Sequence, residues 1–292
     1  MHTTDNNHAS CESCGGQLFE SVACENQCPI LRCRACRLVQ VRPLPEVLDT
    51  GNREYWRIDF DDPSVDRSRK GSIPVYQHGL NRISVLSGKS LCGTTILDVG
   101  SGMGVFLSAV KNTGAIPYGL ELSPDALAYT RKNTGIESLI LGEFETTEIS
   151  DAPFDIITGW NVLEHVRHPK AWLEKAHALL KPDGVILIKV PNVTFSGLIA
   201  RHAPLLRKLG LPTTSYLATR PPLHLYGFSA RTLQGLLRRS GFEVLSVERS
   251  MVRETAGMRG RVVTALAAIA GVATLGRMNF HPLIMAVARK KS

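Results

Sequence analysis

The segment ILDVGSGMG, residues 96–104, limits the fold of this chain more than any other stretch of its sequence. Its first four residues are apolar apart from Asp98, which is typical of a short buried strand. Three glycines at alternate positions then allow a tight turn into residues 105–114, which are predicted as a helix. A strand, a glycine loop and a helix in this order predict a ligand-binding position in an α/β protein.

Apolar runs and helical patterns alternate from residue 91 onward. Further strands are predicted at 117–122, 139–144, 154–161, 184–192 and just after residue 241, and helices at 123–135, 169–184 and 229–241. Ser123 is expected to cap the helix at 123–135, and Gly135 is expected to end it. The alternation predicts a doubly wound, Rossmann-like, mostly parallel sheet that binds its ligand at the carboxyl ends of the strands.

The glycine loop lacks the features that a pyrophosphate requires. A dinucleotide fingerprint needs a third glycine further along the loop, and a P-loop needs Gly-Lys-Ser or Gly-Lys-Thr, whereas Gly104 is followed by Val105. Glu121 ends the next predicted strand, seventeen residues after Gly104. Its carboxylate is placed to accept both ribose hydroxyls of an adenosine. The loop and Glu121 together therefore favour a compact adenosine ligand.

Six of the seven cysteines lie in the first 36 residues. Cys11 and Cys14 form one C-x-x-C pair, Cys33 and Cys36 form another, and 18 residues separate the pairs. This spacing predicts a tetrahedral zinc site of four thiolates, which is structural because no coordination position stays open for water.

Other readings of the cysteines remain open. The two pairs could form disulfides instead, although a reducing compartment disfavours them. Cys24 and Cys28 lie between the pairs, and either could replace one of the four ligands. Cys92 is expected to be a small buried apolar residue.

The composition is that of a folded protein: 43% of residues are hydrophobic and 21% are charged. The net charge of +8 is spread along the chain, so it gives little support for a nucleic-acid partner. The N-terminus has no apolar segment, and we expect a cytoplasmic protein, either a monomer or a homodimer. The apolar stretch at 262–276 is too short to span a bilayer, which takes about 20 residues, and is expected to form a buried helix, a dimer contact or a peripheral membrane contact.

Five segments in order resemble the motifs of class I S-adenosylmethionine-dependent methyltransferases. They are ILDVGSGMG, GLELSP, FDIITGWNVLEHVRHP, LLKPDGVILIKVPN and HLYGFSARTLQGLLRRSGFEV, and the resemblance covers residues 75–250. The cysteine pairs with the following LVQVRPLP and EYW are similar to the zinc ribbon of a subgroup of bacterial methyltransferases. The resemblance implies a seven-stranded sheet and a small N-terminal zinc-binding module.

The resemblance implies S-adenosylmethionine as the cofactor. The residues implied to bind it are Asp98, Gly100, Ser101, Gly102, Gly104, Glu121, Leu122, Glu143, Phe144 and Asn161. For Glu143 the alternative is a solvated loop carboxylate, and Asn161 stands where relatives more often have an acidic residue.

Three residues are candidates for activating the methyl acceptor. His165 follows the fourth predicted strand, and His224 and Tyr226 approach from the other side of the expected site. Catalysis by alignment of the reactants alone is the alternative.

The expected organisation is a zinc ribbon at 1–45, a linker with lid helices at 46–90, the methyltransferase core at 91–250 with a substrate-side insertion at 193–224, and a tail at 251–292. The leading hypothesis is methyl transfer to a small or carrier-linked metabolite, with a sugar or sugar nucleotide as the first guess. An RNA methyltransferase and a non-catalytic binding protein with the same fold are the alternatives.

Overall fold

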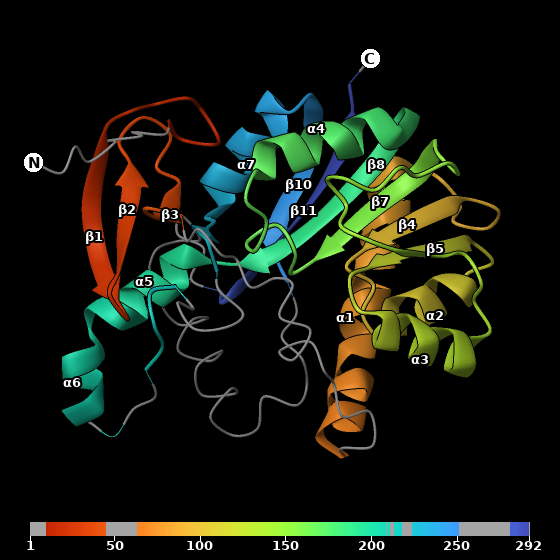
Figure 1. The fold of residues 1–292 in the computed structure, drawn as a ribbon, viewed down its shortest axis with the longest axis horizontal. Helices are drawn as coiled ribbons and strands as arrows, with labels where there is room; N and C mark the ends of the chain where they lie inside the picture. The colour runs from red at the N-terminus through yellow and green to blue at the C-terminus, as the bar shows by residue number, and fades with distance from the viewer. Residues whose placement is uncertain are drawn as a thin grey trace, which may run out of the picture.

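A seven-stranded sheet forms the centre of the molecule (Figure 1). The computed structural model describes residues 10–44, 63–208, 210, 213–217, 224–250 and 281–291. The strands, in spatial order, are β10 (Phe242–Arg249), β11 (Leu283–Lys290), β8 (Leu180–Pro191), β7 (Phe154–Trp160), β4 (Thr95–Val99), β5 (Ile116–Glu121) and β6 (Leu139–Leu141). β11 is antiparallel to both of its neighbours, and the other pairs are parallel. The predicted α/β fold with a mostly parallel seven-stranded sheet is therefore confirmed.

Helices cover both faces of this sheet (Figure 1). One face carries α4 (Pro169–Leu179) and α7 (Ala230–Arg239), and the other carries α1 (Pro63–Ser87), α2 (Val105–Lys111) and α3 (Pro124–Thr134). Trp172 and Leu236 are fully buried on the first face, and Phe106 and Trp160 pack together on the second. The sheet is therefore buried on both sides, as its near-continuous apolar strands require.

Local sequence signals set the ends of two helices. The Ser123 hydroxyl accepts a hydrogen bond from the Ala126 amide at the start of α3, and Gly135, with a φ of +64°, ends that helix. At the start of α7, Ser229 and Thr232 form a capping box. The predicted cap and stop of α3 are confirmed.

A second, four-stranded sheet joins the N-terminal module to the core. Its order is β1 (Phe19–Glu25), β2 (Cys28–Cys33), β3 (Val39–Val41) and β9 (Tyr226–Gly227). The last strand of this sheet comes from the core, about 185 residues after β3 along the chain. The module is thus an integral part of the fold, and its packing depends on the core.

The described residues of the insertion pack against the module. The helices α5 (Val193–Arg201) and α6 (Ala203–Lys208) belong to this insertion (Figure 1). Val193 and Leu217 share an apolar cluster with Ile30 of β2. The Glu25 carboxylate accepts hydrogen bonds from the backbone amides of Tyr216 and Leu217.

The structure differs from two expectations at particular residues. The predicted core ends at residue 250, whereas residues 283–290 form β11, which belongs to the core sheet and lies between β10 and β8. Cys92, expected to be buried, is exposed because it lies in the turn before β4.

The apolar stretch at 262–276 lies outside the described residues. Among the helices that are described, none has the length and apolar character needed to cross a membrane.

Gly79 allows α1 to lie directly on the sheet. A Cβ atom there would overlap the Trp160 ring and lie 3.3 Å from a Leu187 methyl group. We expect Gly79→Ala to destabilise the protein by about 1–3 kcal/mol because the buried indole must move. The matched control is Val85→Ala in the same helix, because the Val85 side chain is 61% exposed. The control should be neutral or gain up to about 1 kcal/mol from helix propensity. Denaturant unfolding of both variants tests this, and equal midpoints would contradict it.

Candidate functional site

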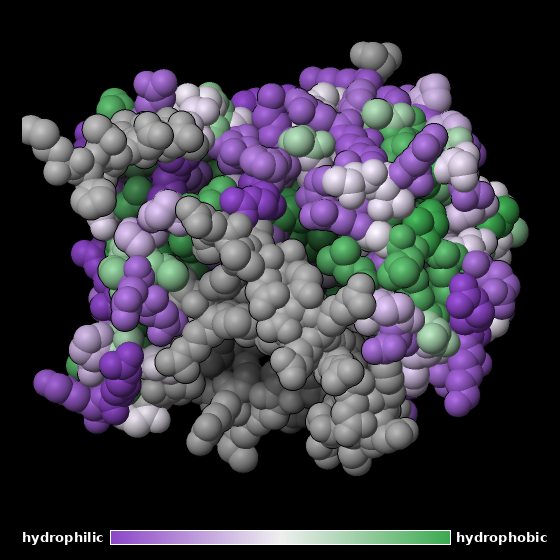
Figure 2. Space-filling model, in the orientation of Figure 1, coloured by the Kyte–Doolittle hydropathy of each residue, from purple (hydrophilic) through white to green (hydrophobic). Residues whose placement is uncertain are grey.

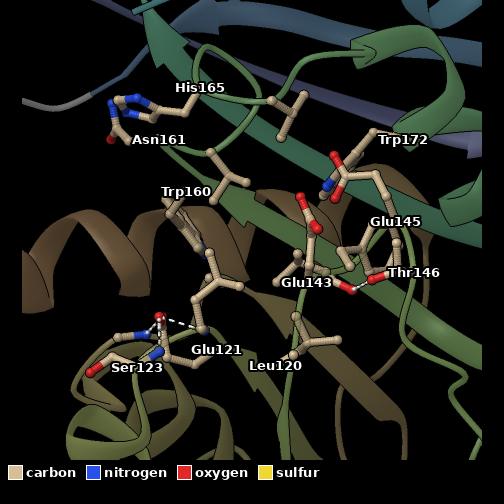
Figure 3. A pocket seen from close by; sticks show the side chains of 18 of the residues that line it. Leu120, Glu121, Ser123, Glu143, Glu145, Thr146, Trp160, Asn161, His165 and Trp172 are labelled. Atoms are coloured by element: carbon tan, nitrogen blue, oxygen red, sulfur yellow. Dashed lines mark hydrogen bonds between the residues drawn. The ribbon is translucent and has the colours of Figure 1, made fainter. Parts of the chain in front are cut away.

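A cavity of about 760 Å³ lies at the carboxyl ends of β4, β5 and β7. Its size is within the range of small-molecule sites. Four segments line it: the glycine loop, the turn after β5, residues 142–146 and residues 160–168 (Figure 3). Figure 2 shows hydrophobic surface gathered in front of β4, β5 and β7, on the same side of the molecule. The cavity is at the position that the sequence predicts for ligand binding.

Glu121 connects two of these segments. One carboxylate oxygen accepts a hydrogen bond from the Gly102 amide at 2.8 Å. The other accepts from the amides of Leu122 at 2.7 Å and Ser123 at 3.0 Å. The glycine loop approaches this closely because Gly100 and Gly102 have φ angles of +74° and +52°. Glu121 is therefore fixed with its carboxylate at the cavity wall.

Two more carboxylates lie on another wall of the cavity. Glu143 and Glu145 flank Phe144, which is buried with its ring 4.8 Å from that of Trp172. Burial raises the pKa of Glu145, and the negative charge of Glu143 raises it further. Figure 3 shows Glu143 and Glu145 on the side of the cavity near Trp172, away from His165.

A polar cluster closes the end of the cavity beyond Trp160. Asn161, with a φ of +59°, donates from Nδ2 to Glu164 Oε1 at 3.1 Å, and its Oδ1 accepts from Lys189 Nζ at 2.6 Å. The Glu164 side chain is 1% exposed, and burial raises its pKa. Its second oxygen, Oε2, has no hydrogen-bond partner among the described residues.

His165 and His224 meet beside this cluster. Their ring centroids are 4.9 Å apart and the rings are nearly perpendicular. Burial, together with the charge of His165, lowers the pKa of His224 to about 4, so this imidazole is neutral near pH 7. His165 lines the large cavity, whereas His224 lines a neighbouring cavity of about 170 Å³ between β9 and the insertion. The two histidines thus lie where the two cavities adjoin.

Most of the predicted cofactor residues are brought together. Those that line the large cavity are Gly100, Gly102, Glu121, Leu122, Glu143, Phe144 and Asn161. The other three do not line this cavity. Asp98 is buried and accepts a hydrogen bond from Thr158, Ser101 has a buried hydroxyl, and Gly104 caps α2. A side chain at Gly104 would overlap Thr130, so this glycine is needed for packing.

Tyr226 lies outside the large cavity. Its hydroxyl donates a hydrogen bond to the Arg167 carbonyl at 2.7 Å, and burial raises its pKa well above the usual range. This phenol holds the 160–168 segment in place. No described residue of the 193–224 insertion lines the large cavity, and several line the smaller one.

Sequence reasoning missed several lining residues. Trp160, Val162 and Arg167 line the large cavity, and so does Trp172 from α4. Trp160 ends β7 and could have been found by the same strand-end rule that selected Glu121. Nothing in the local pattern points to Trp172, whose place depends on how α4 packs.

The four paired cysteines form a compact cluster. Cys11 and Cys36 have their sulfurs 3.5 Å apart, Cys14 and Cys33 have theirs 3.7 Å apart, and all four lie within 4.8 Å of one another. Cys11 and Cys33 are buried. Cys24 and Cys28 are not members of the cluster.

Asp98 makes a testable contribution to stability. Burial, reinforced by the charge of Glu121 and opposed by the hydrogen bond from Thr158, raises its pKa to about 8. The folded protein therefore keeps a proton that an unfolded aspartate loses near pH 4, and the stability that Asp98 contributes falls as the pH rises towards 8. Relative to Asp98→Asn, the unfolding free energy of the wild type should fall by up to about 1.4 kcal/mol per pH unit. Urea unfolding at pH 5, 6 and 7 measures this, and parallel pH curves would contradict it.

Comparison with known proteins identifies the family. The sequence pattern described as "Methyltransferase domain" matches residues 69–247. A ubiquinone biosynthesis O-methyltransferase of Haemophilus ducreyi is 32% identical over 114 residues, which are 36% of this chain and 48% of that protein. One of Xylella fastidiosa is 34% identical over 128 residues, 41% of this chain and 52% of that protein. The chain thus spans about half the length of the curated relatives it matches.

Solved structures share the fold. The 1,6-didemethyltoxoflavin-N1-methyltransferase of Burkholderia thailandensis has a TM-score of 0.54 at 17% identity and covers 94% of this chain and 100% of its own. The magnesium protoporphyrin IX methyltransferase of Synechocystis has a TM-score of 0.53 at 14% identity and covers 84% and 96%. Since the family pattern matches more than half of the chain, this protein belongs to the methyltransferase domain family.

Proposed function

We propose that the protein transfers a methyl group from S-adenosylmethionine to a hydroxyl oxygen of a small or carrier-linked molecule. The observation that carries this proposal is the cavity in which the glycine loop, Glu121 and Glu143 converge. The matched relatives are named O-methyltransferases, and the Burkholderia and Synechocystis structures both contain S-adenosylhomocysteine.

The chain's own residues fit this cofactor. A side chain at Gly100 would come within 2.7 Å of Val162, so the glycine keeps the backbone of the loop close to the cavity. Glu121 would accept hydrogen bonds from the ribose. Phe144 would pack beside the adenine, and the neighbouring Glu143 would make a polar contact with it. The cofactor supplies an activated methyl group on a positively charged sulfur.

The protein has to align the acceptor and exclude water. The acceptor oxygen must approach along the line of the carbon–sulfur bond, opposite the sulfur, and alignment of this kind contributes a large part of the rate. His165 and Asn161 lie at the end of the cavity beyond Trp160, across from Glu121 (Figure 3). The acceptor would therefore enter beside His165, where the smaller cavity also adjoins.

A panel of acceptors tests the proposal. Purified protein is incubated with tritium-labelled S-adenosylmethionine and either catechols, nucleotide sugars or total RNA. Label in an alkali-stable methyl ether of a catechol or sugar supports the proposal. Label only in RNA, or the absence of S-adenosylhomocysteine binding by calorimetry, would overturn it.

Glu121 provides a direct test of cofactor binding. Replacement by glutamine keeps the size of the side chain but removes the charge that its three amide donors and the ribose require. We expect Glu121→Gln to weaken S-adenosylhomocysteine about 10- to 100-fold, the value of a charge-assisted hydrogen bond. The matched control is Glu137→Gln, since the Glu137 side chain is 74% exposed and forms a surface ion pair with Arg131. Equal dissociation constants for both variants by calorimetry would show that the ribose is held elsewhere.

The N-terminal cysteines fit a structural zinc ion. Tetrahedral zinc with bonds of about 2.3 Å to sulfur places the sulfurs about 3.8 Å apart, close to the 3.5 and 3.7 Å found here. Four thiolates would fill the coordination sphere, so the ion would stabilise the module and take no part in chemistry.

Metal analysis tests the zinc site. We expect one zinc ion per chain in protein purified without chelator, and its loss in Cys33→Ser. The control is Cys92→Ser, because Cys92 is exposed and lies outside the cluster. S-adenosylhomocysteine should still bind the Cys33→Ser protein, since no cysteine lines the large cavity. Zinc-free wild-type protein, or full zinc in Cys33→Ser, would end the proposal.

A further inference from the structure

Three side chains of metal-ligand type meet beside the large cavity. Glu164 and His165 belong to the segment after β7, and His224 comes shortly before β9. One carboxylate oxygen and one nitrogen of each imidazole all lie within 4.8 Å of one another. In the part of the chain that the structure describes, this group and the four-cysteine cluster are the groups of three or more such ligands.

Glu164 shows that the group is incomplete as it stands. Its side chain is 1% exposed, and Oε2 has no hydrogen-bond partner in the described part of the chain. A buried carboxylate oxygen without a partner carries a substantial desolvation cost. Within the described part of the chain, the fold therefore leaves one strong acceptor of this group unsatisfied.

Neighbouring residues orient this carboxylate. Asn161 Nδ2 donates a hydrogen bond to Glu164 Oε1, and Asn161 Oδ1 accepts one from Lys189 Nζ. The lysine thereby fixes the orientation of the amide, with its NH2 group towards Glu164. His165 Nε2 lies 3.9 Å from Glu164 Oε1. Outer partners that fix a carboxylate in this way are typical of metal ligands in proteins.

We propose that Glu164, His165 and His224 bind one divalent transition-metal ion. Two imidazoles and a carboxylate suit zinc, manganese, iron or cobalt. Ion–ligand distances of about 2.0–2.2 Å require ligand atoms roughly 3–4 Å apart, which the observed group reaches by small side-chain rotations. Three protein ligands leave at least one coordination position open.

The open position faces the large cavity, because His165 lines it. For its chemical consequence this inference rests on the proposed function. An acceptor hydroxyl bound to the ion has a lowered pKa and releases its proton to water. The oxygen lone pair then forms the bond to the methyl carbon, and the carbon–sulfur bond breaks with its electron pair left on sulfur. An acceptor with two adjacent oxygens, such as a catechol or a vicinal diol, can chelate the ion and is the substrate class that this site favours.

The test measures metal binding directly on the full chain with the cysteine cluster loaded with zinc. Manganese(II) and cobalt(II) are titrated separately, the first followed by the loss of the free-ion paramagnetic resonance signal and the second by visible absorption. We expect one additional ion per wild-type chain and at least tenfold weaker binding by Glu164→Gln and His224→Asn. Matched controls are Glu174→Gln and His177→Asn on α4, which remove the same chemical groups away from the site.

Each outcome decides the proposal. Wild-type protein that takes up neither ion beyond the zinc, or ligand variants that bind like the controls, would overturn it. His165→Asn serves as a third variant if His224→Asn does not fold, and S-adenosylhomocysteine calorimetry verifies each variant's core. Wild-type protein that binds the ion but no S-adenosylhomocysteine would leave the metal site standing and remove the proposed function.

Discussion

The Glu121 carboxylate joins the segments on which the rest of the site depends. It accepts backbone hydrogen bonds from the glycine loop after β4 and from the turn after β5. Hydrogen bonds to a charged group are worth about 1.5–3 kcal/mol each, and these three add to the bonds that the Gly100 and Ser101 amides donate to the Leu120 carbonyl. Because β4 and β5 are parallel neighbours, both loops leave the sheet at the same edge, and one side chain can reach both. Together these bonds fix the glycine loop beside the cavity that it lines.

The N-terminal module takes part in the same construction. β9 is the fourth strand of the module's sheet, and Tyr226 in β9 holds the Arg167 carbonyl of the segment that lines the large cavity. Arg239 of α7 donates to the Ser13 carbonyl inside the cysteine loop, at 2.7 Å. Loss of order in the module would therefore act on the 160–168 segment through β9. A metal ion bound by the cysteine cluster, as proposed above, would act on the site through this route without contacting it.

Local signals account for what the sequence predicted, and non-local pairing accounts for most of what it missed. The cap at Ser123, the stop at Gly135 and the strand that ends at Glu121 depend on residues within one turn or one strand. β11 was missed because residues 283–290 find their partners in β8 and β10, far away in the sequence. The two-residue β9 is too short for any periodic pattern, and its pairing with β3 is known only from the structure.

The same distinction applies to the site. Strand-end positions such as Glu121 and Asn161 follow from the order of the strands, so they could be predicted. Asp98 could not be placed correctly by this rule, because alternate residues of a strand point to opposite faces and its side chain is buried against Thr158. The contact between His165 and His224 joins residues 59 positions apart. It depends on the position of β9, which directly follows His224 and pairs with β3 of the module.

The join between the module and the insertion has a consequence for acceptor recognition. Glu25, at the end of β1, fixes the backbone of Tyr216 and Leu217, and these two residues line the smaller cavity together with His224. The N-terminal module thus fixes two lining residues of that cavity, and others, such as Pro191 and Asn192, lie at the end of the core strand β8. The smaller cavity therefore changes shape when either part moves, whereas the residues that line the larger cavity all belong to core elements. We therefore expect acceptor binding to depend on the module more strongly than cofactor binding does.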